Sequence, residues 1–196
     1  STLDSEIVAE AMQRQTTFYD KEEDKYNLLS ALQKSVRGSD PDAAVHYLAR
    51  LLHGGADVVM IGRRLLVMAS EDVGMAYPSA ISVVTACVQA AQMVGLPEAQ
   101  FPLADAVLLV CNAPKSNSGH NAILAAREDV RAGKAGPIPR QLQNKHFDGA
   151  DNPVKGQFYK YPHDYPNHWV VQQYLPENLQ GTHYYEYGEN KTEQAY

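Results

Sequence analysis

The sequence contains few cysteines and no long apolar run. Only Cys87 and Cys111 occur among its 196 residues, too few for the disulfide framework that stabilises small secreted domains. The longest apolar run, from Leu103 to Cys111, is broken by Asp105 and is much shorter than the roughly 20 residues that cross a bilayer. Since no signal peptide opens the chain either, we expect a reduced, cytoplasmic protein.

An excess of positive charge is also missing. The chain has 23 acidic and 17 basic residues and a net charge of −6 at pH 7, which argues against a generally basic surface for nucleic acid. One segment, residues 127–145, nevertheless has more bases than acids. Its bases are Arg127, Arg131, Lys134, Arg140 and Lys145. Two interpretations stay open: a contact for phosphate or an acidic partner, and a face that is simply solvated.

The motifs of nucleotide hydrolysis and of nucleophilic catalysis are absent. No G-x-x-x-x-G-K-[ST] loop occurs, so the chain lacks the backbone cradle that holds nucleotide phosphates, and we expect no ATP hydrolysis by this chain alone. No serine lies in a Gly-x-Ser-x-Gly elbow. We interpret Ser70 and Ser116 as helix-end residues, whose hydroxyls satisfy free backbone groups.

The histidines show no spacing that is typical of metal ligands. His46 and His53 lie seven residues apart on one predicted helix, about two turns, which is too far for both to bind one ion. His163, His168 and His183 lie among loop carboxylates without a recognised spacing. We interpret them as packed or exposed side chains, and we predict no catalytic, cofactor-binding or metal-binding residue.

The sequence does contain a succession of amphipathic helices. The clearest begins at Asp40–Pro41, a capping residue followed by a proline suited to the first helical turn, and ends at Gly54–Gly55. A second runs from Val58 through Met68 into the polar block 70–74. Further helices are predicted over residues 3–15, 25–36, 78–94, 102–112 and 118–131. The short loops between them predict an all-α helical bundle or array.

The two ends of the chain differ from this helical middle. The chain begins Ser-Thr-Leu, so we expect a fragment or a processed chain, and the acidic stretch 19–26 predicts a connector. The segment after Gly136 holds eleven of the seventeen aromatic residues. Because disordered tails are poor in aromatics, we expect it to pack on the helical domain, with a short strand near 169–174 and frayed residues after Gly188. The predicted regions are 1–20, 21–135 and 136–196.

Three polar groups are candidates for structural or interface roles. They are Arg63 and Arg64 inside an apolar helix, Glu71 and Asp72 at its end, and Lys115 and Asn117 in a later loop. Acids at a helix C-terminus oppose the helix dipole, so we expect Glu71 and Asp72 to pair with an arginine from a neighbouring helix or subunit. Roles within one chain and roles at a subunit interface both stay open.

Several of these segments together resemble the C-terminal region of the replication-associated recombination protein A (RarA/MgsA) family of AAA+ ATPases, which includes the Werner-helicase-interacting protein of eukaryotes. The matching pieces are KSVRGSDPDAAVHYLAR, IGRRLLVMASEDVGMA, GLPEAQFPLADAV, APKSN, YKYPHDYP and QQYLP, in this order between Tyr19 and Tyr187. The resemblance implies an all-α domain similar to clamp-loader collars that forms a homotetramer. Residues 1–20 would be a remnant of the ATPase lid, and ATP and Mg would bind to the family's N-terminal part.

Three functional hypotheses follow. The resemblance favours an oligomerisation module of an ATPase that acts in DNA replication, recombination and repair at stalled forks, in association with the nucleoid. The second hypothesis is a module that contacts DNA or a single-strand-binding protein through the basic segment 127–145. The third is an independent small-molecule enzyme using Glu71, Asp72, Lys115 and the loop histidines, which no spacing supports.

Overall fold

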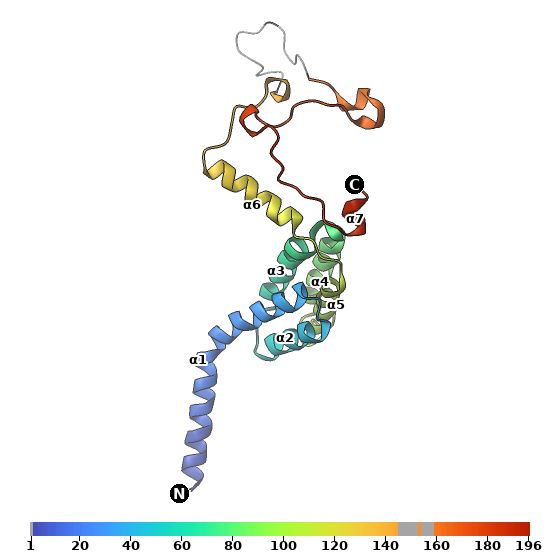
Figure 1. Ribbon diagram of the computed structural model, residues 1–196. Coiled ribbons are helices and arrows are strands. Elements are labelled where there is room, and N and C mark those ends of the chain that lie inside the picture. The colour runs from blue at the N-terminus through green and yellow to red at the C-terminus, as the bar shows by residue number, and fades with distance from the viewer. Residues whose placement is uncertain (1, 145–152, 154–158) are drawn as a thin grey trace. The chain divides into compact units, whose positions relative to one another are not determined.

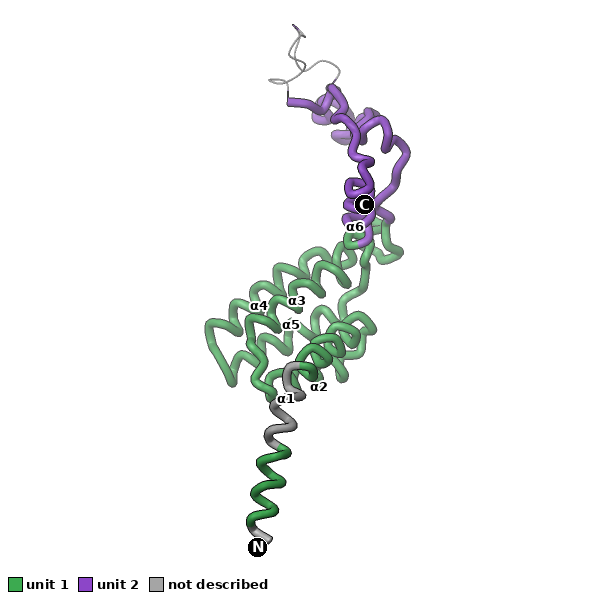
Figure 2. Tube along the Cα trace, turned by 90° about the vertical axis from the view of Figure 1, so that its left-hand side faces the viewer, with its two compact units in different colours: residues 1–120, 187–196 green, residues 121–186 purple. Residues whose placement is uncertain are grey.

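The computed structural model describes residues 2–144, 153 and 159–196. These residues form helices, turns and extended segments, with no β-strand among them, so the predicted all-α fold class is confirmed. The chain divides into two compact units, which Figure 2 shows in different colours. The helical unit comprises residues 1–120 together with 187–196, and the second unit comprises residues 121–186.

The first helix, α1 (Thr2–Arg37), is longer than predicted. The connector predicted at residues 19–26 is wrong as secondary structure, because the helix continues through it without a break. The stretch contains neither glycine nor proline, and its Glu and Lys residues are good helix formers, so nothing in it stops a helix. The predicted domain limit near residue 20 is therefore not marked by a change of secondary structure.

The following helices begin and end close to the predicted positions (Figure 1). They are α2 (Pro41–His53), α3 (Val58–Met68), α4 (Ala80–Val94), α5 (Gln100–Asn112) and α6 (Ser118–Arg131). The carboxylate of Asp40 accepts a hydrogen bond from the backbone N–H of Ala43 at 2.9 Å, and that of Asp57 accepts one from Val59 at 3.0 Å. These N-caps fix where α2 and α3 start. None of the described helices is long and apolar enough to cross a membrane.

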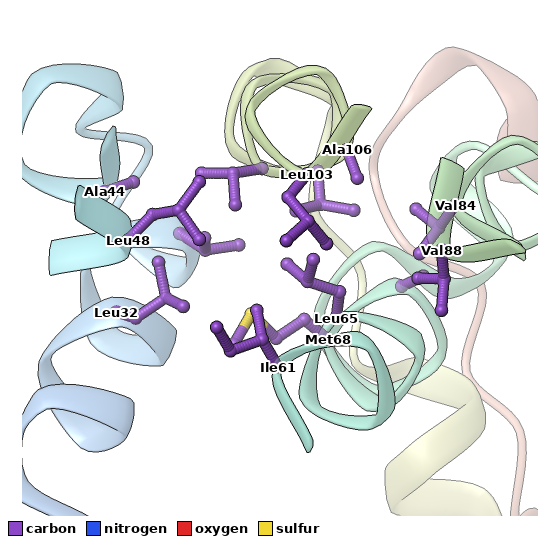
Figure 3. Close-up of a cluster of buried hydrophobic side chains, with 14 of the residues drawn as sticks. Leu32, Ala44, Leu48, Ile61, Leu65, Met68, Val84, Val88, Leu103 and Ala106 are labelled. Atoms are coloured by element: carbon purple, nitrogen blue, oxygen red, sulfur yellow. The ribbon is translucent and has the colours of Figure 1, made fainter. Parts of the chain in front are cut away.

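The core of the helical unit lies where the apolar faces of α1 to α5 meet (Figure 3). Leu32 of α1, Leu65 of α3 and Leu103 of α5 have no exposed surface. Burying a side chain of this kind contributes roughly 1.5–3 kcal/mol. The helices α3 and α4 approach closely at Gly62, where a Cβ would lie 2.5 Å from a methyl carbon of Val88. The absence of a side chain at this position is therefore part of the packing.

The last residues of the chain are ordered, so the predicted fraying after Gly188 is wrong. They form the short helix α7 (Lys191–Gln194), whose N-cap Asn190 accepts a hydrogen bond from the N–H of Glu193 at 2.9 Å. The carboxylate of Glu193 is buried and accepts from the Gly188 N–H and the Asn190 side chain, both at 2.9 Å. The spacing N-x-x-E is close to that of a capping box, which is the signal that sequence reasoning missed.

The second unit consists of part of α6, extended segments and single 3₁₀ turns. The strand predicted near 169–174 is absent from the described residues. The side-chain amide of Gln172 instead donates to the carbonyl of Lys160 at 2.9 Å, and its oxygen accepts from the Lys160 N–H at 3.2 Å. This side chain occupies the backbone groups that a pairing strand would need. Whether residues 136–196 pack on the helical domain stays a prediction.

Candidate functional site

The end of α3 forms a buried polar corner, built on a π-helical turn at Ala69–Val73. A π-turn inserts an extra residue into a helix and changes which side chains face inward. Here it buries Asp72 and leaves Glu71 half-buried. The next residue after the turn, Gly74, has φ +48°, and a Cβ there would lie 2.9 Å from the carbonyl oxygen of Ser116. The corner is therefore closed by a backbone contact that favours glycine.

Arg37, at the end of α1, is the partner of both acids. Its Nε donates to Asp72 Oδ1 at 2.7 Å, and its Nη2 lies 3.6 Å from Glu71 Oε1. The hydrogen bond and the charge of Asp72 raise the pKa of Arg37 above its ordinary value. His120 Nε2 also lies 3.6 Å from Glu71 Oε1. The arginine that the acids were expected to require thus comes from a neighbouring helix of the same chain.

The carboxylate of Asp72 is only partly satisfied. Its side chain is 5% exposed, and its second oxygen, Oδ2, is buried without a hydrogen-bond partner among the described residues. The backbone oxygen of Asp72 accepts from the Ser116 N–H at 2.8 Å. A buried acceptor without a partner costs about 1–3 kcal/mol. The hydrogen bond from Arg37 therefore offsets most of the free-energy cost of burying the Asp72 carboxylate.

Lys115 closes the other side of the corner. Its ammonium donates to the carbonyl oxygens of Cys111 at 2.7 Å and Ala113 at 2.6 Å, and to the hydroxyl of Ser39 at 3.1 Å. Burial lowers the pKa of Lys115, opposed by the charges of Cys111 and Asp72. A cation at the C-terminal carbonyls of a helix is stabilising. Because all three ammonium protons are engaged, this lysine is placed as a cap of α5 rather than as a base.

The remaining polar candidates do not converge on this corner. Arg63 and Arg64 are both exposed on α3, and Asn117 is exposed in the loop before α6. The ion pairs of Glu71 and Asp72 within the described residues involve Arg37 and His120 instead. Sequence reasoning missed Arg37 and His120, and also Gln33 and Ser39, because their approach depends on how α1 and α5 pack. The one local signal was the position of Arg37 directly before Gly38–Asp40, the turn that leads into α2.

The five bases of the segment 127–145 are in different environments. Arg127 and Arg131 are exposed on α6, and their spacing of four residues places them on one helical face. Lys134 lies 3.6 Å from Asp129, and Arg140 is half-buried. Lys145 lies outside the described residues. The structure therefore offers Arg127 and Arg131 as a small basic face, with two of the other bases differently engaged.

Among the exposed apolar side chains of the described residues, two groups are close together in the sequence. The first, which we call the α4–α5 patch, lies at the connection of these helices, with Met93 86% and Phe101 62% exposed. Its members are Met93, Val94, Leu96 and Phe101. The second is α6, on which no residue is buried and which exposes Ile123, Leu124 and Val130. Groups of exposed apolar side chains are typical of protein–protein contacts.

Among the described residues, the polar groups of the corner make contacts between helices. Among the described residues there is no group of three or more His, Cys, Asp or Glu that could hold a metal ion. Cys87 and Cys111 are free, and burial raises the pKa of both thiols, which lowers their reactivity at neutral pH.

The comparison with known families places this helical domain among the C-terminal regions of AAA+ ATPases. The family described as MgsA AAA+ ATPase C terminal matches residues 38–196, and the chain belongs to this family.

Similar proteins are named replication-associated recombination protein A. The protein of Bacillus subtilis (strain 168) is 50% identical over 181 residues, which cover 92% of this chain and 43% of the relative. That of Escherichia coli (strain K12) is 37% identical over 185 residues, 93% of this chain and 41% of the relative. ATPase WRNIP1 of Dictyostelium discoideum is 36% identical over 178 residues, 90% of this chain and 20% of the relative. The resemblance predicted from the motifs is confirmed, and the chain spans less than half of each relative.

Proposed function

We propose that this chain is a homo-oligomerisation module, and that it gathers the ATPase modules of a replication-associated recombination protein into a tetramer. The observation that carries this proposal is the α4–α5 patch, which leaves four large apolar side chains exposed within nine residues of sequence. A soluble domain seldom exposes such a group unless another protein covers it. The family resemblance supports a second copy of the same chain as that protein.

The size of the patch sets a condition on the assembly. Burying one large apolar side chain contributes about 1.5–3 kcal/mol. Association of two molecules costs at least about 4 kcal/mol in lost translational and rotational freedom. The four side chains of the α4–α5 patch must therefore be buried together, and the apolar residues of α6 offer a separate contact. A ring or closed assembly that uses both surfaces satisfies this condition better than a single isolated contact.

Gathering subunits would serve the rest of the protein. The relatives extend well beyond the region matched here, and in our proposal ATP and Mg²⁺ are bound in that other part. Several ATPase modules held together bind DNA with higher avidity, because each linked module meets the DNA at a high effective concentration. The chain itself would not hydrolyse ATP, since its sequence has no phosphate-binding loop and the ammonium of Lys115 is fully engaged.

Sedimentation equilibrium over a range of concentrations tests this proposal. The chain should form a tetramer at tens of micromolar, and the double variant Met93→Glu/Phe101→Glu should shift the equilibrium to smaller species. The matched control is Ser82→Glu, which adds a charge at an exposed position near the other end of α4. A native chain that stays monomeric throughout the range would rule out the proposal.

A second function is favoured by the exposed pair Arg127 and Arg131. We propose that this face contacts DNA phosphates or the acidic tail of a single-strand-binding protein. Such contacts weaken steeply with salt, since bound counterions are released. Fluorescence anisotropy with single-stranded DNA should show salt-sensitive binding that Arg127→Glu/Arg131→Glu abolishes. The variant Arg63→Glu/Arg64→Glu makes the same charge change elsewhere and should bind normally; equal losses in both would indicate a general charge effect.

A further inference from the structure

Two histidines that are not neighbours in sequence meet in the second unit. His163 lies in the 3₁₀ turn Pro162–Asp164, and His168 ends the next turn, Pro166–His168. Asn167 and His168 have φ of +57° and +55°, a left-handed conformation that turns the chain back on itself. As a result the Nδ1 atoms of His163 and His168 lie 3.2 Å apart. Their spacing of five residues did not predict this contact.

Two ring nitrogens at this distance require something between them. A neutral imidazole carries a lone pair on one nitrogen and a proton on the other. Two lone pairs facing each other repel, so the contact is stable in one of two ways: one ring carries its proton on Nδ1 and donates it to the other, or a cation binds both lone pairs. Both rings are exposed, so a cation from solution reaches this position without any rearrangement of the core.

The distance between the nitrogens fits two ligands of one tetrahedral ion. With Zn–N bonds of about 2.0–2.1 Å, two nitrogens at a tetrahedral angle lie about 3.3–3.4 Å apart. Ligands at a right angle, as in square-planar or octahedral ions, would lie about 2.8–3.0 Å apart. The observed 3.2 Å is closer to the tetrahedral value, which zinc prefers.

The orientation of the rings supports the same conclusion. Their centroids are 4.9 Å apart and their planes meet at 58°. Two imidazoles bound to a tetrahedral zinc through Nδ1 would have centroids about 5.2 Å apart. A straight N–H···N hydrogen bond of the observed length would separate them by about 5.5 Å. The rings are therefore bent toward a common point beside the line that joins the nitrogens, where an ion would sit.

We infer that His163 and His168 form a binding site for zinc, with both Nδ1 atoms as ligands. The protein supplies two of the four positions, and water or a donor atom of another molecule fills the others. The ring of Tyr161 packs on that of His163, with centroids 5.1 Å apart, and fixes its orientation. Backbone hydrogen bonds from Asp164 to Tyr161 and from His168 to Tyr165, both 3.0 Å, hold the two turns before the ion arrives.

Calorimetric titration of the tag-free protein with zinc chloride tests this inference. The variants are His163→Gln and His168→Asn, since asparagine is tolerated in the left-handed conformation of position 168. The control is His183→Gln, which removes another exposed histidine of the same unit. The native protein and the control should bind one zinc per chain. Each variant should bind zinc at least tenfold more weakly. The loss of an outer-shell group alone costs about 10- to 100-fold in metal affinity, and these variants lose a direct ligand.

Nitrogen NMR of the histidine rings gives a second readout that does not depend on affinity. Saturation with zinc should shift the Nδ1 signals of His163 and His168 and leave a proton on each Nε2. The inference is overturned if the native protein shows no saturable binding, if either variant binds as tightly as the native protein, or if the shifted signals belong to other histidines. Circular dichroism of the variants should be unchanged, since both side chains are exposed.

Discussion

The two units of the chain are stabilised by different kinds of contact. Every buried apolar side chain of the described residues belongs to the helical unit, between Leu29 and Cys111. In the second unit no described residue is buried, and its tryptophan, Trp169, is 69% exposed. Side chain–backbone hydrogen bonds connect its segments instead, such as those from Gln141 to Gln173 and from Asn178 to Lys134. One unit is held by apolar burial and the other by polar contacts.

This difference separates stability from recognition. Apolar burial stabilises the helical unit without any partner, because the area removed from water is within the chain. The second unit keeps its aromatic and apolar side chains on the surface, where partners reach them. We therefore expect substitutions of buried residues in the helical unit to change mainly the free energy of unfolding. Substitutions in the second unit should change mainly local order and binding.

The largest effect is expected in the helical core. Leu65→Ala should lower the free energy of unfolding by about 2–5 kcal/mol, because it leaves a cavity among fully buried side chains. The matched control is Leu124→Ala, which truncates an exposed leucine of the second unit. This control should change the free energy of unfolding by less than about 0.5 kcal/mol. Urea unfolding followed by circular dichroism measures both. Similar losses in the two variants would contradict the division between the units.

A smaller loss is expected at the polar corner. Arg37→Ala should lower the free energy of unfolding by about 1–3 kcal/mol, because the buried carboxylate of Asp72 would lose its hydrogen-bonded partner. The larger loss of stability that follows when a fully buried ion pair is broken is not expected here. Arg37 is 49% exposed, and water replaces part of its contact with Asp72. Arg63→Ala removes an exposed arginine and should have almost no effect. If the two variants are equally stable, the corner contributes nothing.

A local effect is expected in the second unit. Asn178→Ala removes the 2.7 Å hydrogen bond to the carbonyl of Lys134, worth about 0.5–1.5 kcal/mol. Amide hydrogen exchange should rise around residues 132–136 and 176–180, and the exchange of α3 and α5 should stay unchanged. Exposed Gln180 provides the control substitution Gln180→Ala. Faster exchange throughout the helical unit would show that the two units unfold together.

The smallest effect is expected at alkaline pH, where Lys115 and Tyr184 should contribute to stability in opposite directions. The pKa of Lys115 is lowered in the folded chain, so the folded chain releases this proton at a lower pH than the unfolded chain does. The contribution of Lys115 to the free energy of unfolding therefore rises as pH approaches the ordinary value of 10.5. The hydrogen bond to Asp129 raises the pKa of Tyr184, so its contribution is present below the ordinary value of 10.0 and is lost as pH rises through the folded pKa.

Unfolding and hydrogen exchange between pH 8 and 11 measure these two responses. Tyr184→Phe should remove the alkaline loosening near residue 129 and leave the response of the helical unit unchanged. Lys115→Met should remove the gain that Lys115 contributes, so that the free energy of unfolding of the variant should fall relative to that of the native chain as pH rises. A second unit that loosens equally with and without the Tyr184 hydroxyl would indicate that another group titrates.

The helix boundaries of the middle of the chain were predictable because their signals are local. Asp40 caps α2 and Asp57 caps α3 through bonds that span two or three residues, and Gly95 ends α4 with φ +70°. The family and the all-α fold were also predictable, from motifs and periodicity. The continuity of α1 was missed because acidic residues were interpreted as a connector although they are compatible with a helix.

The contacts of the corner and of the histidine pair were not predictable from spacing. Arg37 and Asp72 are 35 residues apart, and Lys115 and Ser39 are 76 apart, so these contacts depend on the packing of whole helices. His163 and His168 meet because Asn167 and His168 itself, both in the second turn, adopt left-handed backbone conformations. Sequence patterns give the polarity and period of an element, and they do not give the register between elements.

The close approach of α3 and α4 at Gly62 has a consequence for how the sequence can change. A side chain at this position would collide with Val88 at 2.5 Å, so Gly62 and Val88 share one small volume. A larger residue at 62 becomes acceptable only when residue 88 shrinks, for example in the combination Gly62→Ala with Val88→Ala. The two positions are thus free to vary as a pair, and neither is free to vary alone.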